Sequence, residues 1–174
     1  MDPLFADTFL IDEARAFNFF STTLSDVLDQ DRRGPVCRDE FLYVTSILAH
    51  YALVESGNPN YLPIPGTLRD LHDLFATNFD TWHDASLMET AAAQTLMLTG
   101  YYAGAMRARH NLQTYVDWGR FFFGQAASGT DGRKRALLQT MSRHFPLWRG
   151  HLEQLHTLLW ENRLLIDTPS RSAA

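Results

Sequence analysis

Histidine offers the widest range of chemistry in this chain, which holds seven histidines. Glu153 and His156 have the Glu-x-x-His spacing that places a carboxylate and an imidazole on one helix face in di-iron bundles. That chemistry needs a second such pair and two further carboxylates, and no second pair occurs in the sequence. His144 and His151 are about 10 Å apart along a helix, too far for one ion to join them. We therefore expect no metal site and no cofactor.

The one cysteine, Cys37, is the other candidate nucleophile. It precedes a predicted helix, where the helix N-terminus would stabilise a thiolate, but Asp39 and Glu40 follow at once and oppose that effect. The sequence around it matches no cysteine-enzyme signature. The whole sequence also contains no serine nucleophile elbow, phosphate-binding loop, dinucleotide fingerprint or zinc-ligand spacing. The sequence thus lacks a complete catalytic set and favours a protein that is not an enzyme.

An aromatic and arginine-containing region between 101 and 123 is the candidate surface for a ligand or partner. Its members are Tyr101, Tyr102, Tyr115, Trp118 and Arg120, next to three consecutive phenylalanines at 121–123. Such side chains can line a pocket between helices. Aromatic residues at helical spacing are also typical of a core, where Tyr and Trp find partners for their polar atoms. Core packing is the simpler interpretation, and the pocket supports the alternative of a small-molecule binder or enzyme.

Charge is distributed unevenly along the chain, whose formal net charge is −5. Residues 1–31 hold seven acids against one arginine, a net of −6, whereas 104–150 hold eight basic residues against two acids, a net of +6. An acidic protein is not a typical nucleic-acid binder. The two segments either face each other, within a chain or across a dimer, or the basic one binds an anion. No glycine-rich phosphate loop accompanies the arginines, so we favour the first interpretation.

The elements that must position these residues are helices, because apolar residues recur at three- and four-residue steps and no strand-like alternation occurs. The pattern predicts helices over 7–30, 37–56, 84–108, 112–128 and 133–165, and a short one from Thr67 to about 78. We expect a single all-α domain of six or seven helices over 1–167, with a disordered tail over 168–174. Gly100 and Gly104 share one face of the 84–108 helix and predict a close crossing with the 112–128 or 37–56 helix.

The last helical stretch carries an apolar seam with heptad spacing. Its members are Leu138, Met141, Phe145, Trp148, Leu152, Leu155 and Leu159. Pro146 interrupts it and predicts a kinked helix or two helices nearly in line. The flanks lack the acidic and basic pairs of an exposed coiled coil, so the seam packs against other helices of its own chain or of a second copy. Because the acidic and basic segments can pair across a twofold axis, we expect a homodimer.

No segment resembles a membrane span or a secretion signal. The most apolar runs, 41–54 and 91–106, are shorter than the roughly 20 residues that a span needs. The first residues, Met1, Asp2 and Pro3, lack a basic region. With one cysteine and so no internal disulfide, the chain is expected to be cytoplasmic and not membrane-bound.

Four segments together resemble a group of uncharacterised, all-helical bacterial proteins of similar size. They are 41–51, 94–102, 115–120 with Phe123, and 143–148. The resemblance implies a helical fold and a bacterial source, and it brings no activity, cofactor or catalytic residue. Members carry an aspartate near Ala93 and Gln94 and a tyrosine near Phe123, and this chain departs at both places. The function we expect is that of a non-enzymatic interaction or regulatory protein, which could bind a protein partner.

Overall fold

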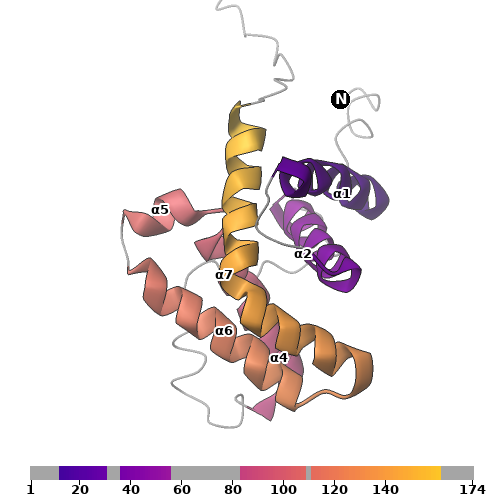
Figure 1. Ribbon diagram of the computed structural model, residues 1–174, viewed down its shortest axis with the longest axis vertical. Helices are drawn as coiled ribbons and strands as arrows, with labels where there is room; N and C mark the ends of the chain where they lie inside the picture. Colours follow the sequence, from indigo (N-terminus) through magenta and orange to yellow (C-terminus); the bar gives the residue numbers. More distant parts are fainter. Residues whose placement is uncertain (1–11, 31–35, 56–82, 109–110, 162–174) are drawn as a thin grey trace, which may run out of the picture.

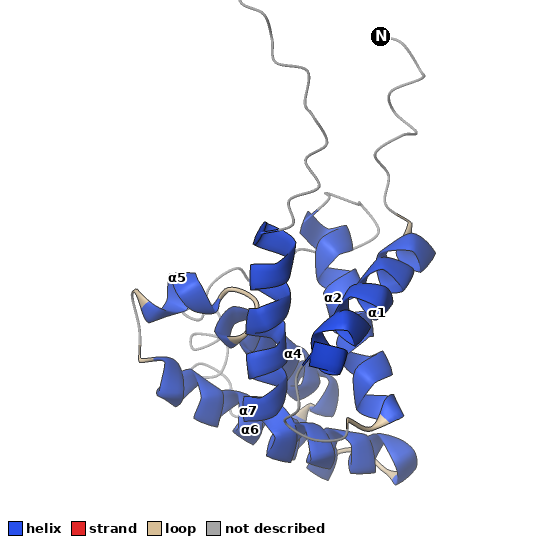
Figure 2. Ribbon diagram, turned by 45° about the horizontal axis from the view of Figure 1, so that its top comes forward, coloured by secondary structure: helices blue, strands red, loops and turns tan. Residues whose placement is uncertain are grey.

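The described part of the chain is entirely helical apart from its turns. The computed structural model describes residues 12–30, 36–55, 83–108 and 111–161. These ranges form α1 (Glu13–Gln30), α2 (Arg38–Glu55), α4 (Ala85–Thr99), α5 (Ala103–Arg107), α6 (Leu112–Ser128) and α7 (Gly132–Glu161). They contain no strand, as Figure 2 shows, which confirms the all-α prediction. The helix predicted from Thr67 and the predicted tail over 168–174 lie outside the described residues.

The long helix α7 connects two groups of helices (Figure 1). Its first part packs with α6, which in turn packs against α4, and α1 and α2 pack against each other and also contact α7. Local signals in the sequence set several of the helix starts. Asp84 accepts hydrogen bonds from the backbone N–H groups of Ser86 and Leu87, and Asn111 accepts one from Gln113. These side chains satisfy donors that a helix start leaves free, which is the role predicted for Asn111.

The seam of α7 forms the centre of the core. Leu138, Met141, Phe145, Trp148, Leu152 and Leu155 are completely buried within one chain, and Leu159 is partly buried. They pack with residues of the other helices, among them Leu24, Leu48, Leu96 and Phe122. The sequence left open whether the seam packs within one chain or between two, and the structure shows it packed within one. The seam is therefore not exposed for association with a second copy, contrary to the preference for a dimer through it.

Pro146 lies inside α7 without ending it. The helix changes direction between its first part, orange in Figure 1, and its last part, yellow. A proline has no N–H for the carbonyl four residues earlier, which here belongs to Ser142. The Arg120 Nε of α6 donates a long hydrogen bond, 3.4 Å, to that carbonyl, and Ser142 Oγ donates back to the Arg120 carbonyl over 2.7 Å. The predicted kinked helix is thus one continuous helix with a side-chain donor near its proline.

The helix predicted over 84–108 is divided into α4 and α5 at Gly100, which corrects the prediction. A Cβ on buried Gly100 would lie 2.8 Å from Leu152 Cβ and 3.1 Å from the Arg149 carbonyl oxygen, so the close neighbour is α7 and neither of the helices predicted. A Cβ on Gly104 would meet no described atom within 4 Å, so Gly104 makes no close crossing there. The pair therefore does not act as one packing motif, because the break in the helix separates the two glycines.

Candidate functional site

The aromatic residues predicted as a ligand surface lie on two different elements. Tyr101 and Tyr102 are in the turn between α4 and α5, with ring centroids 5.1 Å apart, and Tyr101 also meets the His156 ring at 4.8 Å. Tyr115, Trp118 and Arg120 lie on α6. Tyr101, Tyr102 and Trp118 are partly buried and packed against the core, the position that the simpler interpretation gives them.

Arg120 lines a shallow hollow at the contact between α6 and α7. The hollow has a volume of about 310 Å³ and is lined by Asp117, Arg120, Phe121, Gly124, Gln125 and Ser142. The guanidinium of Arg120 already spans the contact, because its Nε donates to the Ser142 carbonyl. Phe121 is exposed at its rim, with 43% of its surface accessible. Arg120 is thus part of the helix contact as well as of a small concave surface.

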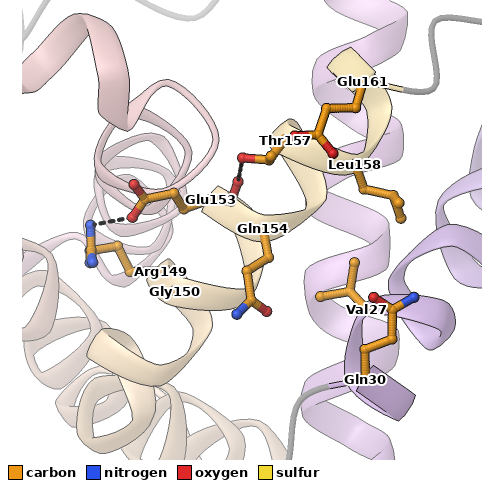
Figure 3. A pocket seen from close by; sticks show the side chains of 9 residues that line it. All are labelled: Val27, Gln30, Arg149, Gly150, Glu153, Gln154, Thr157, Leu158 and Glu161. Atoms are coloured by element: carbon orange, nitrogen blue, oxygen red, sulfur yellow. Dashed lines mark hydrogen bonds and ion pairs between the residues drawn. The ribbon is translucent and has the colours of Figure 1, made fainter.

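A larger opening, which we call the α1–α7 groove, lies between the C-terminal end of α1 and the C-terminal half of α7 (Figure 3). Its volume is about 600 Å³, which falls in the range of roughly 300–1,000 Å³ typical of small-molecule sites. The groove is lined by Val27, Gln30, Arg149, Gly150, Glu153, Gln154, Thr157, Leu158 and Glu161. Two apolar side chains, two amides, a hydroxyl and charged groups therefore border the opening.

The ion pair of Glu153 holds one side of this groove. Arg107 Nη2 donates to Glu153 Oε2 over 2.8 Å, and Arg149 Nη1 lies 3.2 Å from the same oxygen. Although burial works against the charged form, these two arginines hold the pKa of Glu153 below its ordinary value. Figure 3 shows Arg149 and Glu153 pointing away from α1, whereas Leu158 points toward it. The charges of Arg149 and Glu153 are thus largely satisfied within the chain.

The Glu153 and His156 pair is not arranged as metal ligands. The Glu153 carboxylate binds two arginines, and the His156 ring stacks on Trp160 with an interplanar angle of 10°. Among the residues that the structure describes, no group of three His, Cys, Asp or Glu side chains is placed to hold an ion. The structure therefore gives these two residues packing and ion-pair roles.

A buried carboxylate that sequence reasoning missed links α2 to α7. Glu40 is 2% exposed, and its Oε2 accepts from Trp148 Nε1 over 2.7 Å and lies 2.9 Å from His144 Nδ1. The His144 side chain is 45% exposed, so the imidazole connects the buried carboxylate with the surface. The only sequence signal is that His144 and Trp148 are four residues apart and share a helix face. The bonds give Glu40 the partners that a buried carboxylate needs.

Most cationic side chains of the basic segment, residues 104–150, pair with acids of the same chain. Five of its eight cationic side chains pair with acids: Arg107 and Arg149 with Glu153, Arg133 with Asp39, Lys134 with Glu89, and Arg135 with Asp131. Those acids lie on α2, α4, α7 and the turn before α7. Arg133 holds the pKa of Asp39 below its ordinary value through a hydrogen bond and its charge. Each of these five groups thus has an acidic partner outside residues 1–31, although Arg107 and Arg149 share Glu153.

Across the described ranges, no helix combines the length and the apolar character needed to cross a membrane. Comparisons with protein families, with curated proteins and with solved structures found no match to this chain.

Proposed function

We propose that this protein acts by binding, as a non-enzymatic regulatory or interaction protein that takes a small polar molecule in the α1–α7 groove. The observation that carries the proposal is the groove itself, an opening of about 600 Å³ with both apolar and hydrogen-bonding walls. Ligand sites in proteins combine such an apolar wall with a few polar groups that orient the ligand.

The walls of the groove are suited to binding a small polar molecule because they offer apolar contacts and hydrogen bonds at separate places. Val27 and Leu158 offer aliphatic contact, and the amide of Gln30 offers donors and an acceptor. The Thr157 hydroxyl donates to the Glu153 carbonyl over 3.1 Å, which leaves its oxygen as an acceptor. A molecule with a short aliphatic part and polar ends fits this combination of groups.

The test is a pair of matched substitutions on α7. Gln154→Trp fills the groove, whereas Gln139→Trp adds the same side chain at an exposed position of the same helix. Thermal stability is measured with a panel of amino acids, sugars, nucleosides and amines. We expect at least one class to stabilise the wild type and Gln139→Trp but not Gln154→Trp. A panel in which no compound distinguishes the two variants would refute the proposal.

The cellular setting that we propose is the cytoplasm, and the chain is proposed to form a homodimer there. A reducing compartment suits a protein whose Cys37 is free and exposed. A dimer would have to use surfaces other than the buried seam of α7. Light scattering at low and high salt tests it, since opposite charges that pair across an interface are screened over about 8 Å at physiological ionic strength. A monomer at low salt would remove the dimer and leave the groove proposal intact.

A further inference from the structure

The α1–α7 groove is lined by the last turn of α1 and by the C-terminal half of α7, including its last turn. Val27 and Gln30 come from the last turn of α1, and Leu158 and Glu161 come from the last turn of α7. Neither helix has a basic residue in its last turn. A helix C-terminus carries a partial negative charge of about half a unit, which favours cations within the last turn. Two such ends therefore place partial negative charge where they meet the groove.

The side chains of the groove add one negative charge to these helix ends. Among the described residues of its lining, Arg149 is the one cationic side chain, and its guanidinium binds Glu153 and, over 3.3 Å, the carbonyl of Thr99. Glu153 is in turn paired with Arg107, which lies outside the lining. Glu161 is an exposed carboxylate at the end of α7 and faces the same opening. Because two arginines neutralise Glu153, the negative charge that the described lining adds is that of Glu161.

We propose that the α1–α7 groove binds a small organic ammonium compound, with the ammonium group near Glu161 and the aliphatic part against Val27 and Leu158. This inference rests on the proposed function and adds the chemical class of the ligand. The Gln30 amide oxygen would accept a hydrogen bond from an N–H group. An anion would meet both helix C-termini and the Glu161 carboxylate, so the groove selects against it.

Three four-carbon probes of matched length test the class: putrescine, 1,4-butanediol and succinate. Binding is measured by calorimetry on the full chain and located by NMR chemical-shift changes. We expect putrescine to bind most tightly, butanediol weakly and succinate not at all. Putrescine binding should be lost in Gln154→Trp, retained in Gln139→Trp, and weakened by added salt.

A second pair of variants separates a local charge from the overall acidity of the chain. Glu161→Gln should weaken putrescine binding about two- to five-fold, the range of one exposed ion pair. Asp117→Asn removes the same charge from α6 and should change the affinity little. Both substitutions are at exposed positions, so the variants are expected to fold.

The outcomes separate the ligand class from the proposed function. Succinate or butanediol binding at the groove, lost in Gln154→Trp and tighter than putrescine, would overturn the ammonium class and leave the binding function standing. Equal weakening of putrescine by Glu161→Gln and Asp117→Asn would also overturn it, because the attraction would then be the general acidity of the chain. Putrescine binding that Gln154→Trp does not change would overturn both.

Discussion

Gly119 of α6 should be the glycine of the described chain that is least able to accept a side chain. A Cβ at this position would lie 2.2 Å from Cζ and 2.3 Å from Cε2 of Phe145. The Phe145 ring has no exposed surface and packs against Phe123 at a centroid distance of 6.1 Å, so it has little room to move. Gly119→Ala therefore forces either α6 and α7 apart or the ring out of its place.

The magnitude follows from two opposing effects. Replacing a helical glycine by alanine stabilises a helix by about 1 kcal/mol. Overpacking a close-packed core costs about 1–3 kcal/mol, and an overlap this large belongs at the upper end. The expected net loss is thus about 2 kcal/mol in the free energy of unfolding. For a chain of this size, that corresponds to a fall of about 4–8 °C in the melting temperature.

Gly124 provides the control because it lies on the same helix. The nearest atom to a Cβ there is Ser142 Oγ at 3.8 Å, an ordinary van der Waals contact. Gly124→Ala should stabilise the protein by about 0.5–1 kcal/mol through backbone entropy alone. Urea unfolding of both variants measures the difference. If Gly119→Ala is as stable as Gly124→Ala, the close approach of α6 to Phe145 is wrong.

Three further predictions concern the buried and paired polar groups. Trp148→Phe removes a hydrogen-bond donor from buried Glu40 and should lower the free energy of unfolding by about 1–3 kcal/mol, measured with urea. The same substitution should cost less in a Glu40→Gln background. Equal costs in the two backgrounds would contradict the hydrogen bond. Burial and Glu89 raise the pKa of Tyr43, so the protonated phenol stabilises the fold below pH of about 10, and this stability is lost as the pH rises further. Tyr43→Phe should reduce the loss of stability at alkaline pH. Identical curves of stability against pH for the two proteins would refute this prediction. Because the pKa of Glu153 is lowered in the folded protein, its carboxylate stabilises the fold above pH of about 4.3, and this stability is lost as the pH falls through the pKa of the folded state. Glu153→Gln should therefore lose less stability on acidification. Denaturation of both proteins from neutral to acid pH measures the difference.

The helices that local sequence determines were predictable to within a residue or two. The 112–128 prediction matches α6, Leu112–Ser128, and the predicted cap Asn111 makes its hydrogen bond to Gln113. An N-cap acts over three residues, and the apolar period of α6 reflects the face that it buries. The 37–56 prediction, made from an apolar run that is typical of a buried helix, agrees with α2, Arg38–Glu55. Such features need no knowledge of what the helix packs against.

The break at Gly100 depends on tertiary contacts and could not be predicted in this way. Spacing places Gly100 and Gly104 on one face of a continuous helix, but the helix ends where Leu152 of α7 approaches Gly100. The burial of Glu40 has the same origin. A glutamate in the first turn of a helix is ordinarily an exposed group near the helix dipole. Here α7 covers it and supplies Trp148 and His144 as partners.

The α1–α7 groove could not be predicted from residue types either. Its amides, hydroxyl and aliphatic side chains are common on any helix surface, and only the angle between α1 and α7 brings them to one opening. Residue type also gave no sign of the structural contact that Arg120 makes. An arginine among aromatic residues suggests an anion or ligand site, yet its Nε donates to the carbonyl of Ser142, four residues before Pro146. The proline removes the backbone N–H from which this carbonyl would otherwise accept a hydrogen bond, and Arg120 supplies a donor in its place. Because residues 120 and 146 are far apart in the sequence, this role of the arginine could not be predicted. A ligand at the hollow beside Arg120 would have to compete with that hydrogen bond, whereas a ligand in the α1–α7 groove meets amides and a carboxylate at the surface of the fold.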